Sequence, residues 1–222
     1  MACTGKSMTI TSQKGQMLEG AQLQSAKLVI PDLTVPKKTM AIDLEVAAPA
    51  ADVVRYLSAE PLGFAQPLSL NAESISGSAT GSLQFRFNLP SERLGIQPEL
   101  DMNITAQLND VAQPGFLGYM DASGVNGTLA ITRNQLDYDG QLAWDGVPLT
   151  VDLTHLLGQT DEPYPTQYTA SGTVPAEKLG VFGLPDLPFL SGAGAMQAQV
   201  KRASAGIRNL NVQADLTGLG VD

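Results

Sequence analysis

The sequence contains little of the side-chain chemistry on which most enzymes depend. Among its 222 residues there is one histidine, His155, and one cysteine, Cys3. A single cysteine supports neither an internal disulfide nor a cysteine metal cluster, and His155 has no second histidine with which to hold zinc. No nucleophile elbow, phosphate-binding loop or dinucleotide fingerprint occurs. We therefore expect no enzyme, no catalytic residues, no cofactor and no metal, and we expect His155 to be structural.

Basic charge is also scarce. The chain has 13 Lys and Arg against 22 Asp and Glu, which gives a net charge of −9. A surface that follows nucleic-acid phosphates needs clustered Lys and Arg, so nucleic acid is not expected as a partner. Asp137, Asp139 and Asp145 lie close together in the sequence but lack the further oxygen ligands of a calcium loop. We expect them to be solvated charges on strands.

Long hydrophobic runs are missing. No stretch approaches the ~18 consecutive apolar residues of a transmembrane helix, and residues 1–10 have no apolar signal-peptide core. The chain is therefore either cytoplasmic or a piece of a longer, exported protein that carries the signal or anchor elsewhere. A clean strand pattern at residues 210–216, directly before the last residues, favours the piece.

What the sequence does contain is an alternation of apolar and polar residues that recurs along the chain. Residues 38–46 and 82–89 show it most clearly. A period of two places alternate side chains on opposite faces of a strand. The pattern predicts a mainly β protein with a long antiparallel sheet that has one large apolar face, and it leaves open what covers that face. Because aromatic residues make up only 5% of the chain, that face is aliphatic.

Strands and turns follow from this alternation. Asp139-Gly140 and Asp145-Gly146 are predicted as hairpin turns, since Asp-Gly favours the tight turns of hairpins. The strands are expected at 8–11, 20–30, 39–46, 68–75, 81–89, 99–108, 127–132, 135–144, 147–153, 168–174, 194–201 and 210–216.

Two short helices are predicted at 49–57 and 175–182, each opened by a proline. Each is followed by a Pro- and Leu-rich stretch, a Ser-Gly pair and a new strand. This similarity indicates an internal repeat. We expect a lead-in over 1–16, a first groove repeat over 17–174 and the start of a second over 175–222. The helices could cap the open ends of the groove.

Several segments carry a resemblance to a known family. They are residues 28–33, 51–57 with 60–63, and 75–83, and then 168–174, 190–194 and 210–216 in the second copy. Over most of residues 17–222 the chain resembles the periplasmic repeat region of AsmA-like proteins, in particular the YhdP-type and TamB-related branch. The resemblance implies a periplasmic segment of a longer protein anchored in the inner membrane. It also implies phospholipid transport through a β-groove across the bacterial envelope, toward the outer membrane, with both membrane ends supplied by other parts of that protein.

The sequence and the resemblance together predict a mainly β fold, a long, curved, repeat-built antiparallel sheet whose apolar face forms an open groove. The chain would be a segment of a bridge-like lipid-transfer protein that binds phospholipid acyl chains on that face. A structural or adhesive β-solenoid or sandwich without a ligand stays open as an alternative, and a carbohydrate-active β domain as a remote one. The candidate lipid-binding residues share the inward parity of their strands: Ile42, Leu44, Val46, Leu83, Phe85, Phe87, Met102, Ile104, Leu129, Ile131, Leu142, Trp144, Leu149, Val151, Leu153, Met196, Val200, Val212 and Leu216.

Overall fold

The computed structural model describes residues 2–3, 5–16, 20–59, 70–89, 100–116, 120–157, 162–182, 188–203, 206–215 and 217–221. Most of them lie in strands. The strands are β1 (Ala2–Cys3), β2 (Met8–Gln16), β3 (Gln22–Ile30), β4 (Thr39–Pro49), β5 (Ser76–Asn88), β6 (Leu100–Phe116), β7 (Met120–Thr132), β8 (Gln135–Trp144), β9 (Val147–Leu156), β10 (Thr166–Pro175), β11 (Leu190–Ala203), β12 (Gly206–Asp215) and β13 (Leu219–Val221).

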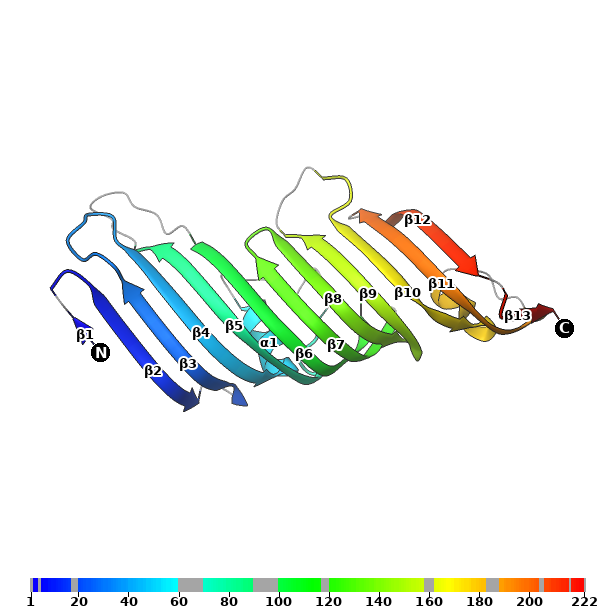
Figure 1. The fold of residues 1–222 in the computed structure, drawn as a ribbon, viewed down its shortest axis with the longest axis horizontal. Helices are drawn as coiled ribbons and strands as arrows, with labels where there is room; N and C mark the ends of the chain where they lie inside the picture. The colour runs from blue at the N-terminus through cyan, green and yellow to red at the C-terminus, as the bar shows by residue number, and fades with distance from the viewer. Residues whose placement is uncertain are drawn as a thin grey trace.

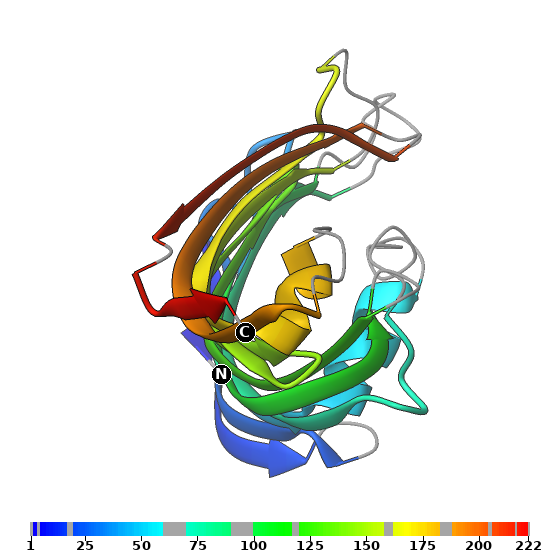
Figure 2. The same cartoon turned by 90° about the vertical axis from the view of Figure 1, so that its right-hand side faces the viewer.

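The strands form one antiparallel sheet in which each strand pairs with the next along the chain, from β1 to β12. The short β13 pairs with residues 190–192 of β11. Within the described residues, the two ends of this order do not pair with each other, so the sheet is open. It extends as a long ribbon from the N-terminus to the C-terminus (Figure 1) and is C-shaped in cross-section (Figure 2). The predicted open, curved antiparallel sheet is confirmed.

Glycines on the inner face allow the sheet to bend sharply. Gly127 of β7 lies opposite Gly140 of β8. A Cβ at Gly127 would lie 2.6 Å from the Gly140 Cα atom, so neither position has room for a side chain. Irregular pairing adds to the bend, because the β6–β7 register shifts after Leu108 and Asp110 adopts a φ of 49°. Such bulges and glycine kinks are what a coiled sheet requires.

Most strand predictions agree with the structure, and two local predictions are wrong. Residues 72–74 form a turn in the second half of the strand expected at 68–75, while 68 and 69 lie outside the described residues. Asp139-Gly140 is not a hairpin turn, because both residues lie within β8 and pair with Asp152 and Val151. Asp145-Gly146 does form the expected turn, with φ of 47° and 81° at its two residues.

In the part of the chain that the structure describes, two helices connect neighbouring strands. Helix α1 (Ala50–Ser58) joins β4 to β5, and the 3₁₀ helix η4 (Ala176–Phe182) joins β10 to β11. Both lie inside the curve of the sheet and do not cap its ends (Figure 2). The reason is their amphipathic pattern, which turns an apolar face toward the apolar face of the sheet.

Local contacts fix the ends of α1. Pro49 occupies the N-cap with φ of −55°, a conformation that proline favours. Asp52 lies in the first turn, where a negative charge is stabilised, and its carboxylate accepts a hydrogen bond of 2.7 Å from Arg55. In the last turn the Ser58 hydroxyl donates to the Val54 carbonyl at 2.6 Å.

Candidate functional site

The concave face of the sheet is crossed by rows of apolar side chains. Antiparallel pairing places one inward residue of each strand opposite the next, so a row runs across the strands. One row, here called the central row, spans nine strands from β4 to β12 without a charged residue. It consists of Val46, Gly81, Ala106, Leu129, Tyr138, Leu153, Tyr168, Val200 and Leu210.

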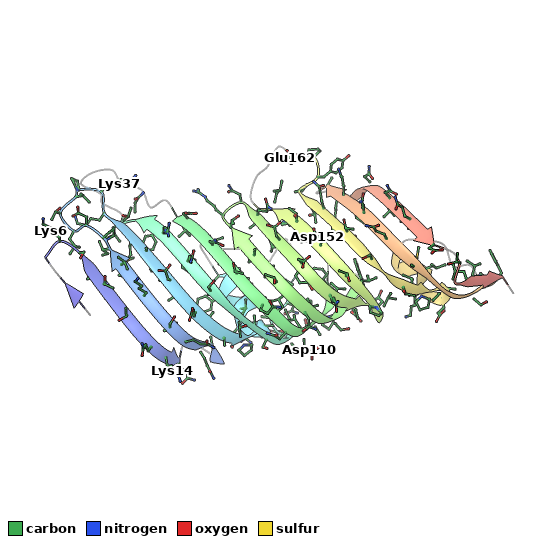
Figure 3. The ribbon with its side chains drawn as sticks, viewed as in Figure 1. Lys6, Lys14, Lys37, Asp110, Asp152 and Glu162 are labelled. Atoms are coloured by element: carbon green, nitrogen blue, oxygen red, sulfur yellow. The ribbon has the colours of Figure 1, made fainter. Side chains whose placement is uncertain are left out.

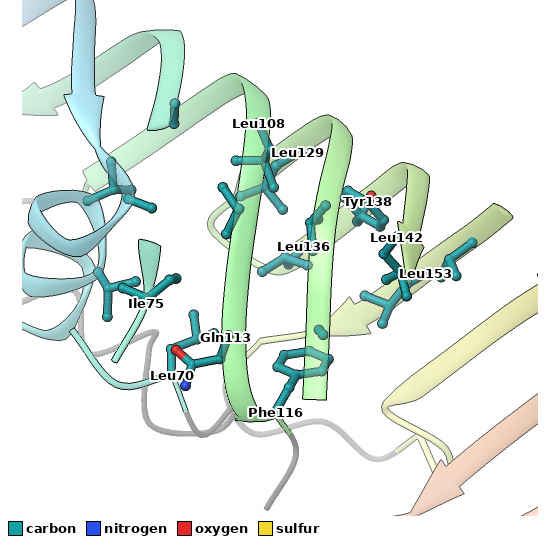
Figure 4. A pocket seen from close by; sticks show the side chains of 18 of the residues that line it. Leu70, Ile75, Leu108, Gln113, Phe116, Leu129, Leu136, Tyr138, Leu142 and Leu153 are labelled. Atoms are coloured by element: carbon teal, nitrogen blue, oxygen red, sulfur yellow. The ribbon is translucent and has the colours of Figure 1, made fainter. Parts of the chain in front are cut away.

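A cavity of about 180 Å³ lies between this face and α1. Helix α1 supplies Val53, Val54 and Leu57, and the sheet supplies the middle of the central row. Figure 4 shows Leu129, Leu136 and other side chains of β6–β9 directed into the same space. Among the described residues, none with a charged side chain lines this cavity, so the lining they form suits hydrocarbon and is unfavourable for ions.

The helices cover part of the concave face and leave the rest half-exposed. Leu57 of α1 packs on a buried cluster that includes Met102, Ile104 and Ile131. Leu179 of η4 belongs to a second cluster formed with β8–β11. The apolar face is therefore neither bare along its whole length nor closed by a second sheet in the part of the chain that the structure describes.

The structure places eighteen of the predicted lipid-binding residues on this one face. Eight are buried: Met102, Ile104, Ile131, Trp144, Leu149, Val151, Met196 and Val200. The other ten are half-buried: Ile42, Leu44, Val46, Leu83, Phe85, Phe87, Leu129, Leu142, Leu153 and Val212. Leu216 lies outside the described residues.

Only six of those residues line the cavity itself: Leu129, Ile131, Leu142, Trp144, Val151 and Leu153. The predicted lining does not include α1, because the sequence analysis considered the helices only as possible caps on the open ends. It also missed Val111, Phe116 and Val125, which lie on β6 and β7 beyond the predicted ends of these strands. The apolar residues were visible there, but bulges in β6 and β7 interrupt the alternation that would have marked them as strand.

Comparison with known proteins assigns the chain to a family. The model of the YhdP protein family matches residues 1–222, which is the entire sequence. The chain belongs to the YhdP family. No curated protein and no solved structure matches it. Membership of the YhdP family agrees with the resemblance found in the sequence at the level of that family.

The convex face of this YhdP-family sheet is polar. Gln84, Arg86, Asp101 and Asn103 are exposed, and their pairing places them on the face opposite the central row. Figure 3 shows Asp152 in the middle of the sheet, with Lys14 and Asp110 along one rim and Lys6, Lys37 and Glu162 along the other. The two faces therefore separate sharply into one that favours water and one that favours hydrocarbon.

Polar groups on the concave face are few and mostly satisfied. His155 Nδ1 lies 2.8 Å from the Thr166 hydroxyl, and burial, followed by the nearby Arg202 charge, lowers the His155 pKa. Burial, with a smaller effect of Asp139, raises the pKa of Tyr138 to about 12, so its phenol stays neutral. Among the described residues no three His, Cys, Asp or Glu side chains could together hold a metal ion. None of the described helices has the length and apolar character to cross a membrane.

Proposed function

We propose that this chain is a segment of a bridge-like lipid-transfer protein, and that its concave face carries the acyl chains of phospholipids. The central row is the observation that carries the proposal. It offers acyl chains an apolar path across nine strands that no charge interrupts. Membership of the YhdP family supports the same function.

The driving force would be the transfer of acyl chains from water to the apolar face, about 0.8 kcal/mol for each buried methylene. The polar head group would remain in water at the open side of the C-shaped sheet. A mostly aliphatic face without charged anchors in the central row holds a chain without fixing its position, so lipid could slide along the sheet. No catalytic step belongs to this proposal, and direction would come from other parts of the longer protein.

The proposal extends to the cellular setting that the resemblance implies. We place the segment in the periplasm, as part of the repeat region of a longer protein of the TamB-related branch anchored in the inner membrane. The two helices support a repeat, since α1 and η4 occupy equivalent connections between paired strands on the same face.

One observation favours the alternative of a structural β domain without a ligand. The clusters under α1 and η4 are buried by the protein itself, so part of the apolar face acts as a core. A core alone does not account for the half-buried apolar residues of β4 and β5 that belong to neither cluster, such as Ile42 and Phe87.

Lipid extraction and native mass spectrometry of the purified chain distinguish a lipid-carrying segment from a structural β domain without a ligand. We expect phospholipid to co-purify with the chain and to be lost in Leu129→Asp, which places a charge in the cavity. Thr105→Asp is the control, because Thr105 is exposed on the convex face and its cross-strand partners Ser82 and Ala130 carry no charge. A well-folded chain that is free of phospholipid would favour the structural alternative. Equal loss of lipid in both variants would show that lipid binding does not depend on the concave face.

A further inference from the structure

A second row of the concave face changes character along the sheet. It runs beside the central row, two residues away along each strand, from β4 to β11. It consists of Leu44, Leu83, Ile104, Ile131, Leu136, His155, Thr166 and Arg202. The first five residues of this row are apolar and the last three are polar, so the row becomes polar over β9–β11.

The three polar residues, here called the rim cluster, lie at the ends of their strands. His155 is the penultimate residue of β9, Thr166 is the first residue of β10 and Arg202 is the penultimate residue of β11. All three are half-buried. Strand pairing places Thr166 between the other two, opposite His155 on one side and Arg202 on the other. The cluster therefore lies at the rim of the concave face.

His155 and Thr166 retain one hydrogen-bond donor between them. The His155 Nδ1 lies 2.8 Å from the Thr166 hydroxyl oxygen. Burial, followed by the nearby Arg202 charge, lowers the His155 pKa, so near neutral pH the ring carries one proton. With that proton on Nδ1, the ring donates to Thr166 and the hydroxyl proton is left over. With the proton on Nε2, the hydroxyl donates to Nδ1 and the Nε2–H is left over. Either tautomer leaves one donor for a further acceptor.

Arg202 adds a positive charge to the rim cluster. Among the described residues no side chain forms an ion pair or a hydrogen bond with its guanidinium. Glu162 lies along the same rim, but it is exposed in the connection between β9 and β10 and outside the row (Figure 3). A guanidinium presents several N–H donors in a planar fork, which matches the oxygens of a phosphate.

The rim cluster lies directly beside the path proposed for acyl chains. Each of its residues is two positions from a residue of the central row, namely Leu153, Tyr168 or Val200. Two residues of a strand span about 7 Å. The glycerol backbone of a phospholipid can bridge such a gap, with the phosphate on one side and the acyl chains on the other.

We propose that the rim cluster binds the phosphate of a phospholipid head group while the acyl chains lie on the central row. This inference rests on the proposed lipid-carrying function and adds a head-group site to it. Arg202 pairs with the phosphate charge, and the His155–Thr166 pair donates one further hydrogen bond. The apolar part of the second row, over β4–β8, offers the phosphate no such groups.

The test loads the chain from one detergent solution that contains dioleoyl phosphatidylethanolamine and dioleoylglycerol. Dioleoylglycerol has the same acyl chains and lacks the phosphate, and mass spectrometry gives the ratio of the two retained lipids. Arg202→Gln should lower the ratio of phospholipid to dioleoylglycerol about threefold to tenfold, between the effects of an exposed ion pair and a buried charge-assisted hydrogen bond.

Lys201→Gln is the matched control, because it removes the same charge from the convex face. Lys201 is exposed, and its cross-strand partners Gln167 and Asn209 carry no charge. This variant should keep the wild-type ratio.

A second measurement needs no substitution and decides the question if Arg202→Gln does not fold. The chain has a single histidine, so the ring nitrogens of His155 give one pair of resonances in a nitrogen-15 NMR spectrum. Phosphatidylethanolamine should shift these resonances and dioleoylglycerol should not. Inorganic phosphate in large excess should leave them unchanged, because it brings no acyl chain to the central row.

The outcomes distinguish this inference from the proposed function. An unchanged lipid ratio in Arg202→Gln, or an equal fall in both variants, would overturn the head-group site while lipid binding stands. Inorganic phosphate that shifts the His155 resonances as strongly as phosphatidylethanolamine would also overturn it, since the cluster would then bind free phosphate. Retention of neither lipid by the wild-type chain would overturn the lipid-carrying function and the inference with it.

Discussion

Replacing Gly140 by alanine tests how the sheet acquires its curvature. Gly140 faces Gly127 on the concave side, where β7 and β8 approach too closely for a methyl group. A Cβ at position 140 would lie 2.6 Å from the Tyr138 hydroxyl and 2.7 Å from the Gly127 Cα atom, and closer still to the Asn126 carbonyl oxygen. Either the two strands must separate or the Tyr138 ring must leave its position.

Two costs add in this variant. An extra methyl group forced into a well-packed site costs about 1–3 kcal/mol. Displacing the Tyr138 hydroxyl from the Gln141 carbonyl removes a hydrogen bond worth about 1 kcal/mol. We therefore expect Gly140→Ala to lower the free energy of unfolding by about 2–4 kcal/mol.

Urea titration followed by circular dichroism measures this loss. Gly15→Ala is the matched control, since it lies in β2 and its Cβ would be 3.7 Å from the Leu23 side chain, an ordinary contact. The control should change the free energy of unfolding by no more than about 0.5 kcal/mol. Unchanged stability in Gly140→Ala, or an equal loss in both variants, would refute the role of the Gly127–Gly140 contact in the bend.

Three further predictions concern the two faces. Phe85→Asp should abolish phospholipid retention and leave the strand signal in circular dichroism intact, because Phe85 is only half-buried. Ile104→Asp should instead unfold the chain, because Ile104 is 7% exposed. The same behaviour of both variants in circular dichroism and lipid extraction would contradict this prediction. Asp152 lies opposite Asp139 on the convex face, so Asp152→Lys should raise the free energy of unfolding by about 0.2–1 kcal/mol in low salt, and an unchanged urea midpoint would count against it. Burial holds the His155 pKa below its usual value of 6.5, so the unfolded chain binds that proton more strongly and stability should fall as the pH drops through 6.5 toward the folded pKa. His155→Gln should flatten that fall, and an unaltered pH profile would exclude His155 as its source.

The strands and the antiparallel sheet were predictable from the sequence, because apolar residues that alternate with a period of two indicate strands with one buried face. Residues 135–144 show this best, since they form β8 with the predicted bounds. The same pattern assigned the inward faces correctly, for example for Leu83 and Ile104, which lie opposite each other.

Other features depend on contacts between distant segments and left no local signal. Asp139-Gly140 has the composition of a hairpin turn, but the close approach of β7 requires Gly140 within a strand. The site of α1 was not predictable, because an amphipathic helix covers an end or a concave face equally well. The contact between the Trp144 and Tyr168 rings could not be predicted either, since the curvature of the sheet brings these two residues together.

Photocrosslinking at two adjacent positions tests the central claim most directly. Leu153 lines the cavity on the concave face, and Asp152 is its exposed neighbour on the convex face. A photoreactive phenylalanine analogue is placed at one position or the other, and the chain is illuminated with vesicles of phosphatidylethanolamine and phosphatidylglycerol. We predict crosslinked phospholipid from position 153 and none from position 152. Crosslinks of equal yield at both positions, or none at position 153 in a folded chain, would contradict the assignment of the concave face as the lipid path.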